Sequence, residues 1–195
     1  MKIKKIVDLC KKRGYFYLFT TEGGEQWLSD GVGAYPIGDV PCLDEDTLCA
    51  LFDIPEKARE KMVFRVQQAP SRFCFDDVVP GEVLCEQGAL LLGEGKHGVI
   101  PYKTQQGIQF IDRTHLEPLE GGGQLEVYER IGEHGDMYFA VKRGLLLVAV
   151  ILPYDIINEP FVESLRTLAE LCAVAWENKR AAEEEQLKVN DYDDE

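Results

Sequence analysis

The sequence predicts an α+β fold in which antiparallel β-sheets are flanked by helices and a long amphipathic helix lies near the C-terminus. Three observations support this prediction. A helix pattern occupies residues 2–13, three strand patterns joined by short turns occupy 125–152, and apolar residues at helical spacing occupy 161–176. The turns are too short for a parallel crossover, so the sheets should be mainly antiparallel.

The N-terminal segment is expected to begin with an amphipathic helix. Cations in its last turn suit the helix dipole, and Gly14 is placed to end it. Further helices should begin after Asp44 and at Pro55. Strands are expected at 15–20, 26–29, 34–37 and 63–66. Pro36 suggests that the third of these is an edge strand, because proline donates no backbone hydrogen bond.

The C-terminal segment is expected to be mainly β-structure before its final helix. Strands are expected at 89–92, 99–104, 108–111, 125–131, 137–142 and 145–152, with a Gly-rich turn at 93–98 and a short helical or irregular segment at 113–119. The apolar run Leu145–Leu152 is far shorter than the roughly 18–20 residues of a membrane span, so it should be the central buried strand.

The final helix should begin at an Asn158 cap. Its apolar face is expected to belong to the core, and a partner-binding helix is the alternative. The face consists of Phe161, Leu165, Leu168, Ala169, Cys172, Ala175 and Trp176.

Composition shifts divide the chain. Residues 1–68 should form an N-terminal α+β half, 69–81 a linker, 82–182 a β-meander with the long helix, and 183–195 an acidic disordered tail. Residues 17–28 and 101–111 share the order Thr, Gly, Gln, aromatic, aliphatic, which suggests that the halves are related. A common β-hairpin template is the alternative explanation.

Charge limits the kinds of partner. The net charge of −14 argues against a broad nucleic-acid surface. A local basic helix remains a candidate contact for DNA or another partner, through Lys2, Lys5, Lys11, Lys12 and Arg13. We expect protein partners, a cytoplasmic location and no membrane association, and an oligomer is possible.

No motif predicts a catalytic, cofactor or metal site. The Gly-rich stretch 93–98 resembles a phosphate-binding loop, but Pro101 would break the helix that such a loop needs. The six cysteines contain no C-x-x-C pair, so zinc is not expected and the thiols should be reduced. An enzyme that uses Asp112 and His115 as an acid–base pair is the alternative to a non-enzymatic role.

Two resemblances suggest a function. The motifs Gln26–Gly31, Ala34–Ile37, Asp46–Cys49, Pro101–Thr104, Gly107–Asp112 and Val148–Glu159 resemble phage and prophage proteins of Gram-positive gut bacteria, a family that implies no established activity. The helix at 2–13 before a β-meander, the repeat and the acidic charge resemble DNA sliding-clamp half-domains. The second half lacks the leading helix of a clamp, and the final helix has no clamp counterpart.

Together these observations predict a non-enzymatic phage accessory protein that acts by binding macromolecules. The clamp resemblance implies a DNA replication factor with protein–protein contacts. A plain structural or assembly protein is a further alternative.

Overall fold

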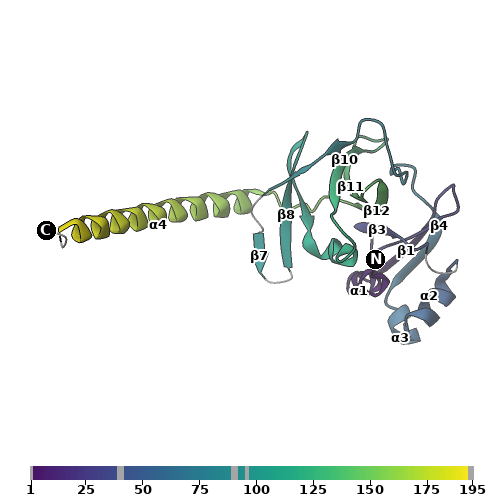
Figure 1. Ribbon diagram of the computed structural model, residues 1–195. Helices are drawn as coiled ribbons and strands as arrows, with labels where there is room; N and C mark the ends of the chain where they lie inside the picture. Colours follow the sequence, from purple (N-terminus) through teal and green to yellow (C-terminus); the bar gives the residue numbers. More distant parts are fainter. Residues whose placement is uncertain (1, 39–41, 89–91, 95–96, 193–195) are drawn as a thin grey trace. The chain divides into compact units, whose positions relative to one another are not determined.

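The computed structural model describes residues 2–38, 42–88, 92–94 and 97–192. The chain divides into two compact units, Met1–Tyr154 and Asp155–Glu195. The first unit holds all the strands and three α-helices of the described residues, and the second contains the helix α4 (Glu159–Tyr192) (Figure 1). The α+β class with antiparallel sheets, flanking helices and a long C-terminal helix is therefore confirmed.

The larger sheet has eight strands among the described residues, in the order β4-β1-β2-β3-β12-β11-β10-β5. Neighbouring strands are antiparallel except for β1 and β4, which are parallel. The predicted central apolar strand is β12, which pairs with β3 and β11. The bounds are β1 Tyr15–Thr20, β2 Gln26–Ser29, β3 Gly33–Pro36, β4 Val63–Gln68, β5 Val83–Leu84, β10 Glu126–Ile131, β11 Met137–Arg143 and β12 Leu146–Ile151.

Strand β3 lies inside this sheet, so the prediction of an edge strand was wrong. Its pairing with β12 involves only Gly33 and Ala34. Pro36 is the last residue of the strand and faces Trp27 of β2, beyond the end of that pairing. The missing N–H of proline therefore removes no hydrogen bond from the β3–β12 ladder.

The smaller sheet is built around β8, which pairs antiparallel with β6, β7 and β9. Its strands are β6 Glu86–Gln87, β7 Leu92–Glu94, β8 His97–Thr104 and β9 Gly107–Asp112. Both members of the suggested repeat are hairpins, β1–β2 and β8–β9, but they lie in different sheets. The predicted strand at 89–92 and turn at 93–98 fall partly outside the described residues.

The helices of the first unit begin close to the residues that the sequence predicts. Helix α1 (Ile3–Arg13) ends at Gly14, whose φ of 77° is unfavourable for residues with a side chain. Helix α2 (Glu45–Leu51) begins with a capping box between Asp44 and Thr47, and α3 (Glu56–Arg59) follows Pro55. The 3₁₀ turns η1 (Arg113–His115) and η2 (Glu117–Leu119) occupy the predicted short helical or irregular segment.

Each face of the larger sheet carries its own hydrophobic core. Phe16 and Leu18 of β1 pack with Ile6 and Val7 of α1 in the main core. Alternate residues of β1, Tyr17 and Phe19, face a second core. That second core is completed by Ala69, Phe73 and Phe75 from the segment that follows β4.

The expected division at 69–81 therefore does not separate two independent halves. This segment connects β4 to β5, two strands of one sheet, and its aromatic side chains pack on that sheet. Long-range pairing of β3 with β12 joins the N-terminal and C-terminal strands. Composition identified the irregular segment but could not show which strands pair across it.

Helix α4 differs from its prediction in two respects. Its apolar face was expected in the core, yet Leu168 and Trp176 are 51% and 58% exposed. Both faces of the larger sheet are already covered from within the first unit. The helix also continues to Tyr192, so residues 183–192 of the predicted disordered tail are helical. Asn158 caps it as predicted, since its Oδ1 accepts from the Phe161 N–H at 3.0 Å.

Candidate functional site

A groove opens on the second face of the larger sheet and is the best candidate for a functional site. Its volume is about 260 Å³. Strands supply its floor, and the turn after β2 and the segment after β4 supply its walls. It is lined by Tyr17, Phe19, Ser29, Gly31, Val32, Ala34, Gln67, Pro70, Arg72, Phe73, Phe75, Val150 and Leu152.

An aromatic row on β1 forms one side of the groove. Because side chains alternate along a strand, Tyr15, Tyr17 and Phe19 project from the same face. Their rings stack with centroids 6.0 Å apart in each successive pair. Exposure falls along the row, from 44% at Tyr15 to 8% at Phe19. The row therefore runs from the protein surface into the groove.

Another part of the lining belongs to the segment 69–82, which specific contacts hold in place. Phe75 packs edge-on against Trp27 with centroids 4.9 Å apart, and Phe73 packs against Tyr138 at 5.1 Å. The Cys74 N–H donates to the Tyr138 hydroxyl at 3.0 Å. These contacts place two aromatic rings over the sheet without any regular secondary structure.

Arg130 of β10 anchors the same segment through its guanidinium group. This group donates to the backbone carbonyls of Cys74 (3.1 Å), Asp76 (2.9 Å) and Asp77 (3.2 Å). It also pairs with Glu82 at 2.6 Å, and Lys142 contacts the other oxygen of that carboxylate. A single buried side chain therefore satisfies carbonyls that would otherwise lack partners in an irregular segment.

The polar groups at the groove are few. Arg72 lies over the Phe73 ring, 4.7 Å from its centroid, and is the only charged side chain among the lining residues. The Ser29 hydroxyl accepts from the Gly31 N–H at 3.0 Å, so it shapes the turn. A mainly apolar wall with one cation suits an apolar group carried by a neutral or acidic ligand.

Asp30 shapes the turn that forms the rim of the groove. Its Oδ1 accepts from the N–H groups of Val32 (3.0 Å) and Gly33 (2.8 Å). Its Oδ2 lies 3.0 Å from His115 Nε2 and 3.4 Å from Arg13 Nε. Burial alone would raise the pKa of Asp30, but His115 and the two backbone N–H groups outweigh burial and lower it.

The predicted acid–base pair of Asp112 and His115 is wrong, because His115 is paired with Asp30. Asp112 Oδ1 instead accepts from the N–H and hydroxyl of Thr114 and caps the η1 turn. The His115 side chain is 2% exposed and does not line the groove. A substrate in solvent therefore has no access to its ring in this conformation.

The predicted basic contact residues of α1 have different surroundings. Lys5 pairs with Glu117 and Glu120, and the pairing with Glu117 is the main cause of its raised pKa. Lys11 donates to the Phe52 carbonyl, and Arg13 pairs with Asp30. Among the described residues, Lys2 and Lys12 have no side-chain partner, as is also true of Lys4, and all three are exposed.

The described residues contain no metal-binding cluster, no disulfide and no helix that could span a membrane. They contain no group of three or more His, Cys, Asp or Glu side chains that could hold a metal ion. All six cysteines are free. None of the helices in the described part of the chain is long and apolar enough to cross a membrane.

Sequence reasoning missed the groove. Phe73 and Phe75 alternate within the irregular segment, and this spacing was the one local signal that the segment packs on a sheet. The rest of the groove depends on the distant pairing of β3 with β12, which no local pattern indicates. Comparison of the chain with family models, curated proteins and solved structures found no match. The phage and sliding-clamp resemblances therefore stay predictions.

Proposed function

We propose that this protein acts by binding a partner protein, whose segment places one large apolar side chain in the groove. The observation that carries this proposal is the composition of the groove, which aromatic rings from β1 and from the segment 69–82 line together. Aromatic pockets of this kind are typical anchor points of protein interfaces.

Size and charge favour a side chain over a cofactor or a nucleic acid. The volume of about 260 Å³ lies below the roughly 300–1,000 Å³ of small-molecule clefts. The groove has one cation, and the chain has a net charge of −14, so it provides little attraction for a phosphate backbone. A single apolar side chain of a partner protein fits the small volume and needs no attraction for a phosphate backbone.

Strand β4 provides a second element of the proposed interface. It is the last strand at one end of the larger sheet, and no strand among the described residues pairs with its outer edge. Gln67 of β4 lines the groove, so the groove reaches this edge. An extended partner segment could hydrogen-bond along β4 while inserting a side chain into the groove, as in strand addition.

The test is selection of peptides from a random 12-residue display library against the full chain. We expect selected peptides to share a large apolar residue, with binding measured afterwards by fluorescence anisotropy. Val32→Lys places a charge in the groove without changing the backbone contacts of the turn. It should weaken binding at least tenfold, or about 1.4 kcal/mol.

The matched control is Ile108→Lys, which alters an exposed apolar residue (46%) away from the groove. This variant should bind the selected peptides as the parent protein does. Equal binding by the Val32→Lys variant, with an unchanged melting temperature, would place the interface elsewhere. Failure to select any peptide above background would contradict the proposal.

A second candidate function is DNA contact through α1, as the clamp resemblance implies. It is supported by three exposed lysines whose side chains have no partner in the described part of the chain, Lys2, Lys4 and Lys12. Combined Lys→Gln substitution at these positions should weaken binding to a fluorescent duplex of about 20 base pairs at low salt. The slope of log affinity against log salt should fall by about 2–3, one step for each lost phosphate contact.

The control for this prediction substitutes three exposed lysines on other elements, Lys57, Lys61 and Lys103, by glutamine. It produces the same change in net charge. If both triple variants lose affinity equally, general charge explains the effect rather than α1. Undetectable binding of the parent protein at low salt would refute the DNA-contact function.

A further inference from the structure

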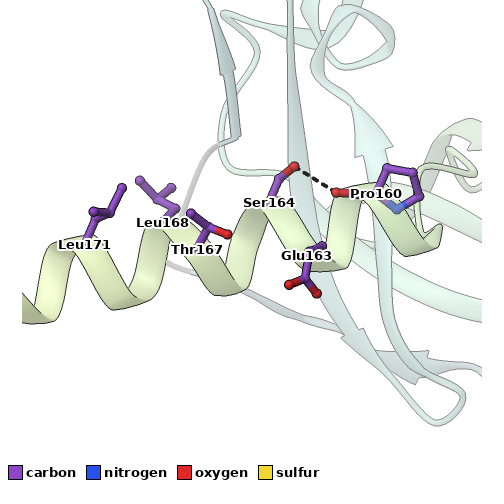
Figure 2. A pocket seen from close by; sticks show the side chains of 6 residues that line it. All are labelled: Pro160, Glu163, Ser164, Thr167, Leu168 and Leu171. Atoms are coloured by element: carbon purple, nitrogen blue, oxygen red, sulfur yellow. Dashed lines mark hydrogen bonds between the residues drawn. The ribbon is translucent and has the colours of Figure 1, made fainter.

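Helix α4 carries a stripe of large apolar side chains that the helix itself cannot bury. Leu168, Leu171 and Trp176 are 51%, 63% and 58% exposed. Figure 2 shows Leu168 and Leu171 on one side of the helix, in line with Ser164, while Glu163 points away from them. A continuous apolar surface of this length indicates an interaction site.

The stripe follows a seven-residue repeat. Its central positions alternate at spacings of three and four residues and are Leu165, Leu168, Cys172, Ala175, Lys179 and Ala182. Leu171 and Trp176 occupy positions that flank this central line on either side. The opposite face carries an exposed glutamate at every seventh position, namely Glu163, Glu170, Glu177 and Glu184. A 3–4 repeat over about three heptads, opposite an acidic face, is the pattern of helices that pack lengthwise against one another.

We propose that this stripe binds the same stripe on a second copy of the chain, with the two helices antiparallel. When Leu168 lies opposite Cys172 of the second copy, the spacing places Leu165 opposite Ala175. Both of these layers join a large side chain to a small one, and the same register places Lys179 opposite Phe161. Pairing a large with a small side chain keeps the distance between the helix axes even across these layers.

A parallel pair would match each residue with its own copy. The layers at Leu165 and Leu168 would then be wide, and the layer at Ala175 would be narrow. The two Lys179 side chains would also meet within the seam, where burial makes like charges unfavourable. In the antiparallel pair the two Lys179 residues lie about 27 Å apart along the axis.

The polar group beside the stripe is compatible with burial. The Ser164 hydroxyl donates to the Pro160 carbonyl at 2.8 Å within the same helix, a contact drawn in Figure 2. It therefore keeps its hydrogen bond when a second helix covers it. The salt bridges of Arg166 with Glu163 and of Arg180 with Glu184 involve residues outside the central positions. Lys179 is a central residue and pairs along the helix with Glu183 at 3.9 Å.

The first test is the solution mass of the full chain between about 1 and about 200 µM. We expect light scattering to show a concentration-dependent rise from 22.0 kDa to twice that mass. Combined Leu165→Glu and Leu168→Glu should keep the protein at the monomer mass over this whole range. Combined Ala173→Glu and Ala181→Glu adds the same charge outside the central positions and should leave self-association within about threefold of the parent protein.

The second test determines the helix direction in a background of Cys42→Ser and Cys74→Ser, which removes the other accessible thiols. One protein keeps Cys172, and the other carries Leu168→Cys with Cys172→Ser. Under mild oxidation, each alone should stay uncrosslinked, and their mixture should give a disulfide-linked dimer. A disulfide requires Cα atoms within about 7 Å, so only the proposed layer allows it.

The possible results separate the alternatives. A monomer at every concentration would overturn the proposal. So would an oligomer that the Leu165 and Leu168 substitutions do not affect, because it would use another surface. Crosslinking of each protein with itself, and no disulfide between the two different proteins in the mixture, would overturn the antiparallel arrangement.

Discussion

Replacement of Arg130 by alanine is expected to lower the free energy of unfolding by about 3–5 kcal/mol. The Arg130 side chain is 1% exposed, and its guanidinium group binds one carboxylate and three backbone carbonyls. Its loss would leave those carbonyls without partners and Glu82 with Lys142 alone. Chemical denaturation of the full chain, followed by tryptophan fluorescence, measures the effect.

The segment 69–82 should open before the rest of the first unit in this variant. Its aromatic residues cover the second core, so hydrogen exchange should increase at Cys74, whose N–H is bonded to Tyr138. Arg130→Lys keeps the charge but cannot reproduce several hydrogen bonds at once, and should recover less than half of the lost stability. Because the segment 69–82 forms a wall of the groove, peptide binding should weaken as the segment opens.

Arg166→Ala is the matched control, since Arg166 is also paired with a glutamate but is 63% exposed. Its substitution should cost no more than about 0.5 kcal/mol. Similar small effects for both arginines would contradict the view that Arg130 organises the segment. Unchanged hydrogen exchange at Cys74 in the Arg130→Ala variant would also contradict the view that Arg130 organises the segment.

Local patterns predicted most of the elements of the first unit. The basic last turn before Gly14 marks the end of α1, and Asp44 with Thr47 marks the beginning of α2, because these signals act within a few residues. The apolar run of β12 predicted an interior strand correctly. In α4 the periodicity predicted the helix and its apolar face, but it carries no information about what covers that face.

The candidate site depends on contacts that sequence patterns cannot reveal. His115 and Asp30 are 85 positions apart, and Arg130 and Glu82 are 48 apart. Proximity in the chain favoured Asp112 as the partner of His115, yet its short side chain is used within its own turn. Buried charges obtain partners from the tertiary fold, and so their pairing follows topology rather than spacing.

Replacement of Asp30 by alanine is expected to lower the free energy of unfolding by about 3–5 kcal/mol. The change removes the acceptor of two turn N–H groups and the hydrogen-bond partner of His115 Nε2. The other ring nitrogen, Nδ1, has no partner among the residues that the structure describes. Asp30→Asn retains an acceptor for the turn and should cost about 1–2 kcal/mol. Urea denaturation at pH 7 measures both.

The dependence on pH distinguishes the charge of Asp30 from its role in the turn. The folded protein lowers the pKa of Asp30, so the stabilisation from its charge is fully present above the unfolded pKa of about 3.9. It is lost as the pH falls through the lower, folded pKa. The difference in stability between the parent protein and Asp30→Asn should therefore be constant near neutral pH and shrink below about pH 4.

Asp112→Ala provides the decisive comparison for Asp30. Asp112 caps the η1 turn through Thr114, so its removal should cost about 0.5–2 kcal/mol, less than Asp30→Ala. A larger loss for Asp112→Ala than for Asp30→Ala would contradict the view that the buried pair of Asp30 with His115 contributes more to stability than the cap at Asp112. Since Asp30 also holds the rim turn, Asp30→Ala should weaken peptide binding in the groove, whereas Asp112→Ala should leave it unchanged.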